Sequence, residues 1–188
     1  MRPVLDIDRI TAPAEPVFAD VSFRTRPAAL RQLLLLREIV ANFDQTRTTM
    51  GLDIGSKQAD LTRMLGSFGL RCVRLDVEGR DDPEGFMLAD GESMPFRDGA
   101  FDYLVMAHVM AHVEHLDLLL SECRRILKPG GKVFILQANR YGWWKFWRYY
   151  LRRKYRKYHW RTFDILDIRH QLASHGIQIR KMFGPYHF

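Results

Sequence analysis

The sequence predicts a three-layer α/β fold with a doubly wound parallel sheet, and three observations support this prediction. The apolar run 50–54 enters a turn at Asp53-Ile54-Gly55. A second apolar run opens on Phe101-Asp102, and the segment 127–131, Leu-Lys-Pro-Gly-Gly, ends a helix and leads into a further strand. A strand that ends in glycine before a helix lets backbone N–H groups approach a ligand at the carboxyl edge of the sheet.

The first half of the chain alternates between helical and strand patterns. Residues 1–25 are rich in Pro and irregular, and Pro27 then starts a helix that we expect to end near Phe43, because its fixed φ suits a first helical turn. The elements that follow are a strand over 50–54, a helix over 60–68 that Gly69 ends, and a second strand over 71–76.

The connection 77–84 departs from the usual doubly wound pattern, because it is too polar and too short for a crossover helix. We interpret it as a loop, which should leave one face of the sheet thinly covered. The later elements are expected at 85–89 (strand), 103–107 (strand), 116–127 (helix), 132–137 (strand), 163–175 (helix) and 178–183 (strand). We expect a single domain over 1–188, with 140–161 as an insert.

Three segments resemble class I S-adenosylmethionine-dependent methyltransferases, and in particular a small bacterial branch of that family. They are 49–56, 89–102 and 127–135, which match the pattern LDIG, DAE-LPF-D-SFD and LKPGG in order and spacing. The resemblance covers roughly residues 50–138. It implies a Rossmann-like methyltransferase fold and the cofactor S-adenosylmethionine, with S-adenosylhomocysteine as product. It also implies methyl transfer to an O or N atom of an acceptor.

The resemblance also implies which residues hold the cofactor. Asp76 follows the glycine turn by about 20 residues, the usual spacing of an acid that hydrogen-bonds a ribose. Asp90 would take the adenine amine, while Asp102 matches a structural position. The expected cofactor contacts are Asp53, Gly55, Ser56 (through its backbone N–H), Lys57, Asp76, Asp90, Gly91 (through its N–H), Glu92, Ala107 and His108.

The chain departs from the family pattern at two places. Only Gly55 remains of the usual Gly-x-Gly-x-Gly, and Lys57 stands where the backbone normally passes close to the cofactor. Ala111 replaces a Glu between His108 and His112, which are the nearest candidates for a general base, with His159 more remote. A spacing of four would place the pair on one helical face. With no third ligand evident, no metal site is expected.

The basic charge of the chain is concentrated in one segment. The formal net charge is +7, and residues 140–161 hold nine Lys and Arg with no Asp or Glu, so the remainder carries 7 − 9 = −2. As a helix, 143–158 would align Trp143, Trp147, Leu151, Tyr155 and Tyr158 in one stripe. That pattern favours binding to an anionic membrane surface. A helix that covers the sheet and, less strongly, single-stranded nucleic acid are the alternatives.

Composition narrows the setting of the protein. No apolar run approaches the ~20 residues of a membrane-spanning helix, and the N-terminus lacks the order of a signal peptide. We expect Cys72 and Cys123 to be buried free thiols, and a cytoplasmic protein that is peripheral to the membrane if 143–158 binds lipid.

Two functions other than an O- or N-methyltransferase remain open. A non-catalytic methyltransferase-like binding module is favoured by the lost glycines and by Ala111. An RNA methyltransferase is favoured by the basic segment alone. The acceptor is expected to be a small or lipid-linked molecule, and the sequence leaves the oligomeric state open.

Overall fold

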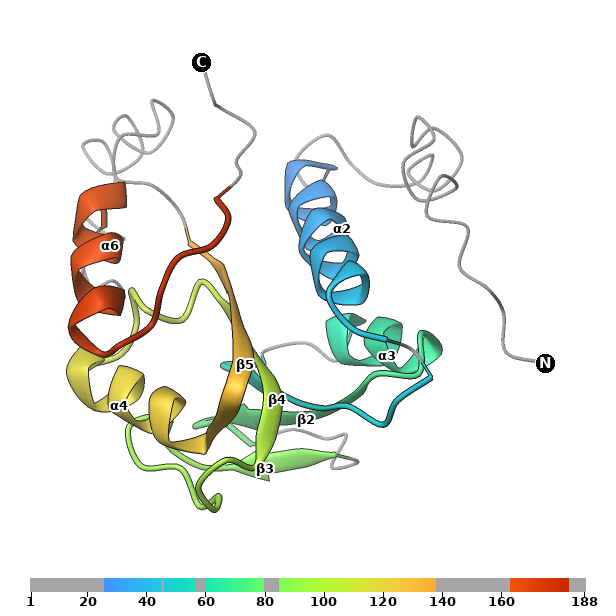
Figure 1. Ribbon diagram of the computed structural model, residues 1–188, viewed down its shortest axis with the longest axis horizontal. Helices are drawn as coiled ribbons and strands as arrows, with labels where there is room; N and C mark the ends of the chain where they lie inside the picture. The colour runs from blue at the N-terminus through green and yellow to red at the C-terminus, as the bar shows by residue number, and fades with distance from the viewer. Residues whose placement is uncertain (1–25, 45, 57–59, 80–84, 138–162, 183–188) are drawn as a thin grey trace.

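A five-stranded, wholly parallel sheet forms the centre of the protein (Figure 1). The computed structural model describes residues 26–44, 46–56, 60–79, 85–137 and 163–182. The strands are β1 (Met50–Ile54), β2 (Arg71–Asp76), β3 (Phe86–Leu88), β4 (Phe101–Ala107) and β5 (Leu127–Leu136), in the order β3-β2-β1-β4-β5. The order reverses direction between β1 and β4, as the predicted doubly wound fold requires.

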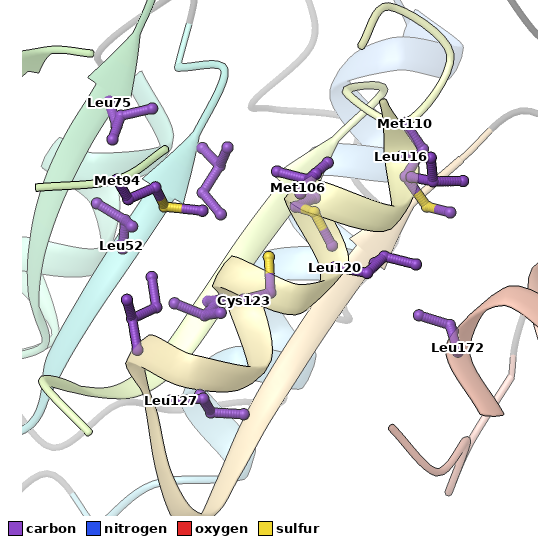
Figure 2. Packing of buried hydrophobic residues seen from close by; sticks show 14 of the residues in the cluster. Leu52, Leu75, Met94, Met106, Met110, Leu116, Leu120, Cys123, Leu127 and Leu172 are labelled. Carbon is purple, nitrogen blue, oxygen red and sulfur yellow. The ribbon is translucent and has the colours of Figure 1, made fainter. Parts of the chain in front are cut away.

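The helices cover both faces of this sheet (Figure 1). α2 (Arg26–Ala41) and α3 (Asp60–Ser67) share one buried cluster with β4, while α4 (Leu116–Ile126) lies on the opposite face. α6 (Ile165–Ser174) packs on the α4 side, and Figure 2 shows Leu172 of α6 facing Leu120 of α4. The three layers that the sequence predicts are therefore present.

Alternating side chains of β4 supply the core on both faces. Leu104 and Met106 point toward α4, whereas Tyr103 and Val105 point toward α2 and α3. Tyr103 is fully buried and its hydroxyl donates to the carbonyl of Arg71 at 3.0 Å. Its ring lies directly over Gly51, its partner residue on β1, so any side chain at position 51 would collide with the ring. A glycine in the first strand is thus required by packing.

Helix α6 is held by a complete capping box. The Asp164 carboxylate accepts from the N–H groups of Leu166 and Asp167, and the Asp167 side chain accepts from the N–H of Asp164. Such a box satisfies donors that would otherwise lack partners at the helix start. It explains why α6 begins at Ile165, two residues later than the sequence predicts.

Two strands begin earlier than the sequence predicts. β4 starts at Phe101 and β5 at Leu127, because these two residues pair with each other across a bulge ahead of the main ladder. The Pro-Gly-Gly segment, expected between a helix and a strand, lies within β5, with Gly130 in the left-handed region at φ +76°. Its glycine therefore serves the bulged strand rather than a separate turn.

The predicted strand over 178–183 is wrong for the part of it that the structure describes. Residues 177–182 form no strand. Gly176 turns the chain out of α6 with φ +69°, and Lys181 then pairs with Glu38 of α2 at 2.8 Å. The segment thus crosses from α6 toward α2, and the described sheet has five strands rather than the six that the sequence predicts.

The connection between β2 and β3 contains no helix in its described residues, 77–79 and 85; the remainder, 80–84, lies outside the described part of the chain. β3 still pairs in parallel with β2, and its Leu88 is 62% exposed. An exposed Leu on the α3 side of an edge strand agrees with the expected thin cover of that face.

Candidate cofactor site

The strand order places a candidate site at the carboxyl ends of β1 and β4, the neighbouring strands between which the order reverses. In open α/β sheets the connections leave this switch point in opposite directions, and ligands bind in the crevice between them. The elements that meet there are the turn after β1, the ends of β2 and β3, and the loop after β4. The predicted cofactor contacts that the structure describes lie on these segments or within the last two residues of β1 and β4.

The turn after β1 is built on Gly55. Its φ is +70°, a left-handed conformation that only glycine adopts without strain. Its N–H donates to the carbonyl of Leu75 at 2.7 Å, and the N–H of Ser56 donates to the same carbonyl at 3.2 Å. The Ser56 N–H that we expected to contact the cofactor is therefore engaged with β2. Lys57 lies outside the described residues, so its role stays a prediction.

Asp53 is almost fully buried, on the face of the sheet that α3 covers. Burial raises its pKa to about 7, against the opposing effects of the nearby Ser56 and Thr62 hydroxyls and of Arg74. Thr62 belongs to the first turn of α3. Asp53, a residue of β1, thus lies close to Ser56 of the glycine turn and to Thr62 of α3.

Asp76 is the last residue of β2, Asp90 lies two residues after β3, and each forms the same kind of bond to the loop that follows it. The Asp76 carboxylate accepts from the N–H of Glu78 at 3.1 Å, and the Asp90 carboxylate accepts from the N–H of Glu92 at 2.9 Å. Each bond uses one carboxylate oxygen, Oδ1, and a carboxylate has room for further donors. Two acids at neighbouring strand ends can therefore accept hydroxyl or amine donors of a bound molecule.

Gly91 and Glu92 have structural roles beside Asp90. A Cβ at Gly91 would lie 3.0 Å from Leu119 of α4, so the loop passes close to the helix. The Glu92 carboxylate accepts from the N–H of His115 at 2.8 Å, immediately before α4 begins. The cofactor contact at Glu92 stays a prediction, and the side chain links the β3 loop to the start of α4.

His108 lies at the end of β4, next to Ala107, in a strained conformation. Its φ is +64°, and among the described residues it is the one non-glycine residue with a left-handed backbone. Its N–H donates to the carbonyl of Leu136 at 2.7 Å, which fixes this conformation beside β5. Strain at a strand end facing a ligand crevice is a frequent feature of functional sites.

The expected helical pairing of His108 and His112 is wrong. Residues 108–115 form turns rather than a helix, with the N–H of His112 donating to the carbonyl of Val109. His112 is exposed, while His108 is half-buried. Within the described residues, no group of three or more His, Cys, Asp or Glu is arranged to hold a metal ion.

Asp102 lies at the amino end of β4, away from the candidate site, and has the structural role that the sequence indicates. It accepts from the Met50 N–H at 2.9 Å and pairs with Lys128 at 2.8 Å. Burial favours the neutral acid, but the bonds from Lys128 and Met50 outweigh it and lower the pKa of Asp102.

Sequence reasoning missed two residues at this edge. Val109 covers the glycine turn: a Cβ on Gly55 would lie 2.6 Å from its Cγ2. Arg74 is buried in the middle of β2, opposite Asp53. The signal for Arg74 was its place in the apolar run of β2, where a buried cation requires a partner.

These features fit a cofactor with hydroxyl, amine and cationic groups. Asp76 and Asp90 supply acceptors at adjacent strand ends, and Gly55 allows a close backbone approach. Together with the switch point, they are the features expected of a nucleotide-type ligand site in a doubly wound α/β protein. The segment 138–162, which includes the predicted membrane-binding helix and His159, lies outside the described residues.

Comparison with known proteins supports the predicted family. Residues 52–135 match the model of a family described as "Methyltransferase domain". This match, together with the curated relatives described below, supports the predicted family of class I S-adenosylmethionine-dependent methyltransferases. A putative methyltransferase from Bacillus halodurans C-125 has the same fold, with a TM-score of 0.63 and 20% identity over 75% of this chain and 66% of that chain. A SAM-dependent methyltransferase from Archaeoglobus fulgidus gives a TM-score of 0.61 and 20% identity over 78% and 68%.

The curated relatives are ubiquinone/menaquinone biosynthesis C-methyltransferases, UbiE. The protein from Acidiphilium cryptum is 31% identical over 119 residues, which cover 55% of this chain and 48% of the relative. The protein from Brucella canis is 34% identical over 94 residues, 47% and 34% of the two chains. The chain thus spans about half or less of the length of these relatives. The family and the structural neighbours support S-adenosylmethionine as the predicted cofactor.

Proposed function

We propose that the protein is an S-adenosylmethionine-dependent methyltransferase. The observation that carries the proposal is the alignment of Asp53, Asp76 and Asp90 after or near the ends of β1, β2 and β3, beside a left-handed glycine turn. The cofactor supplies an electrophilic methyl group: its carbon–sulfur bond breaks as the acceptor forms a bond to carbon, and the sulfur leaves with the electron pair. Such a displacement is accelerated mainly by alignment of the two reactants.

The residues of the chain would hold the cofactor from three sides. Asp76 would accept from the ribose hydroxyls at the carboxyl end of β2. Asp90 would accept the adenine amine, with the Gly91 N–H directed at the ring. His108, fixed at the end of β4, would border the reacting methyl group and could accept a proton from an acceptor that must lose one.

The acceptor class is a separate part of the proposal. The sequence favours an O or N atom, whereas the UbiE relatives are described as C-methyltransferases of quinone biosynthesis. An apolar acceptor of quinone type would reside in the membrane, and the basic aromatic segment 143–158 would bring the protein to that surface. Among the described residues no helix is long and apolar enough to cross a bilayer.

Titration calorimetry with S-adenosylmethionine and S-adenosylhomocysteine tests the enzyme proposal directly. Wild type should bind both, and Asp76→Ala should weaken binding by about 1–3 kcal/mol, because the hydroxyls lose their acceptor in a partly buried site. Asp44→Ala is the matched control: its carboxylate is bonded to Thr46, in the loop that precedes β1. Failure of wild type to bind at millimolar cofactor would leave the non-catalytic module as the better reading.

The acceptor is tested by supplying methyl-labelled cofactor with quinone precursors, with small hydroxyl- or amine-bearing acceptors, and with RNA. Label on carbon of a quinone-type ring would support C-methylation, and label on O or N would support the reading from sequence. Label in RNA would favour the second alternative and remove the need for a membrane acceptor.

A further inference from the structure

Three charged side chains lie in a row on one face of the sheet. Asp53 of β1 is the register partner of Arg74 of β2, and Asp76 follows Arg74 by two positions. Residues two apart on a strand point to the same face, as do register partners on adjacent strands. Asp53 and Arg74 are each only 4% exposed. A carboxylate, a guanidinium and a second carboxylate therefore share the α3 side of the sheet at the candidate site.

Arg74 is held firmly in this row. Its guanidinium carbon lies 5.7 Å from the centre of the Phe86 ring, and Phe86 is its register partner on β3. Its backbone N–H donates to the carbonyl of Gly85 at 2.7 Å. A guanidinium is seldom buried unless charge or an aromatic face compensates it, and here both are present. The burial of Arg74 thus fixes a positive charge between β1 and β3.

The surroundings of Asp53 give this charge a specific effect. The charges of Arg74 and Asp76, both on β2, affect the pKa of Asp53. The charge of Asp53 in turn raises the pKa of Cys72 on β2 and of Tyr103 on β4. The hydroxyls of Ser56 and Thr62 approach it from the turn and from α3. Within this described group Arg74 is the one cation, so it is the charge that opposes the burial penalty on the Asp53 carboxylate.

The charge of the row matters for the two forms of the cofactor. Two carboxylates and one guanidinium sum to −1. S-adenosylmethionine carries +1, from a sulfonium, an ammonium and a carboxylate, whereas S-adenosylhomocysteine has lost the sulfonium charge and sums to zero. A negative row near the ligand crevice favours the charged form over the neutral one, and it does so only while Asp53 is ionised.

We propose that Arg74 is a positioning residue that supplies the positive charge opposite the buried Asp53 carboxylate, so that this edge of the sheet prefers the sulfonium cofactor to its thioether product. The inference rests on the proposed function and extends it to a discrimination between substrate and product. An enzyme with this property would release the product more readily than it releases the cofactor. Arg74 would exert that effect through charge, without touching the cofactor.

The test is the ratio of the dissociation constants of S-adenosylhomocysteine and S-adenosylmethionine, measured by calorimetry from pH 5.5 to 8.5. In wild type the ratio should rise about tenfold as Asp53 ionises, which corresponds to one ordinary charge interaction. In Asp53→Asn the ratio should stay flat. In Arg74→Met the midpoint of the rise should move up by roughly one pH unit.

Two further variants keep the result interpretable. Arg74→Lys retains the charge and should keep the wild-type midpoint, which a purely structural role of the guanidinium would not preserve. The double variant His108→Gln with His112→Gln should retain the rise, because the signal is assigned to Asp53 and not to imidazole. Circular dichroism establishes that each variant is folded.

The outcomes separate this inference from the proposed function. If wild type binds neither molecule, both fail. A ratio that is flat in wild type, a midpoint unmoved in Arg74→Met, or a rise that disappears with the two histidines overturns the inference alone. In these three cases cofactor binding, and with it the proposed function, stands.

Discussion

Val109 closes over Gly55: a Cβ built on Gly55 would lie only 2.6 Å from Val109 Cγ2. The loop after β4 therefore packs directly on the turn after β1, and these two segments flank the switch point of the sheet. Gly55 is the one glycine of the motif that this chain keeps, and two separate requirements apply to it. It must adopt φ +70°, and it must leave room for a side chain from another loop.

Replacement of Gly55 by Ala should destabilise the fold by about 2–4 kcal/mol, adding a left-handed backbone penalty to an overpacked contact. The measurement is the free energy of unfolding in guanidinium chloride. The double variant Gly55→Ala with Val109→Ala should recover the stability lost to the overpacked contact, while the loss from the left-handed backbone should remain. A double variant no more stable than Gly55→Ala would show that Val109 does not press on the turn.

Stability should fall as pH rises from about 4 to about 7, because Asp53 ionises less readily in the folded chain than in the unfolded chain. Its folded pKa of about 7 lies above the ordinary 3.8, so the unfavourable contribution grows through this window and is constant above it. The full difference corresponds to at most about 4 kcal/mol. Asp53→Asn should therefore gain stability over wild type at pH 8 and lose that advantage at pH 4.

That comparison is made without cofactor, by denaturant unfolding at several pH values. Asp117→Asn, at an exposed carboxylate in the first turn of α4, serves as a control and should show no gain in stability at pH 8. A constant offset between Asp53→Asn and wild type across the window would contradict the pKa shift.

His108→Gly should separate stability from function. Glycine adopts the left-handed conformation without strain, so the variant should be more stable by up to about 1 kcal/mol. Cofactor affinity should fall, since the side chain that borders the site is gone. Ala111→Gly, in the same loop at an ordinary φ, should lower stability instead. The idea is wrong if both glycine variants are destabilised to the same extent.

Binding to anionic liposomes should depend on the basic aromatic segment. Each Lys or Arg near an anionic surface contributes about 1 kcal/mol, so replacing Arg152, Arg153, Arg156 and Lys157 by Gln should abolish co-sedimentation and leave cofactor affinity unchanged. Higher salt should weaken wild-type binding, since the Debye length is about 10 Å at 0.1 M.

The matched control for the membrane prediction removes the same charge from the surface of the described residues. It replaces four exposed residues by Gln: Arg37, Arg47, Arg97 and Arg124. This control should still sediment. Retardation of single-stranded RNA without liposome binding would replace the membrane proposal by a nucleic-acid one. Neither activity would mean that the segment covers the sheet with a solvated basic face.

The sequence predicts β1 and β2 to the residue, because each is a short apolar run bounded by polar or glycine positions. It misplaces the starts of β4 and β5, since Phe101 and Leu127 extend each other by pairing across the chain. The same holds for the site. The acids after β2 and β3 follow from order and spacing, whereas the bond from Ser56 to Leu75 depends on how β1 and β2 align.

Arg74 shows most clearly what the sequence pattern does not predict. Its neighbours in the sequence are apolar, and an Arg in such a run is normally assigned to an exposed edge. The ring of Phe86 on β3 packs against its guanidinium, and this contact cannot be inferred from β2 alone. Buried charges are set by three-dimensional neighbours, so sequence periodicity does not detect them.

The bond from Lys181 to Glu38 has a consequence for how the chain matures during synthesis. The two residues are 143 positions apart, so α2 is made early but receives this tether only when nearly all of the described chain has left the ribosome. The β1–β2–β3 ladder, in contrast, joins segments close in sequence and can form first. A nascent chain that stalls before residue 181 would thus carry much of the sheet with α2 still unclasped, which is the stage at which a chaperone or a protease would find it most accessible.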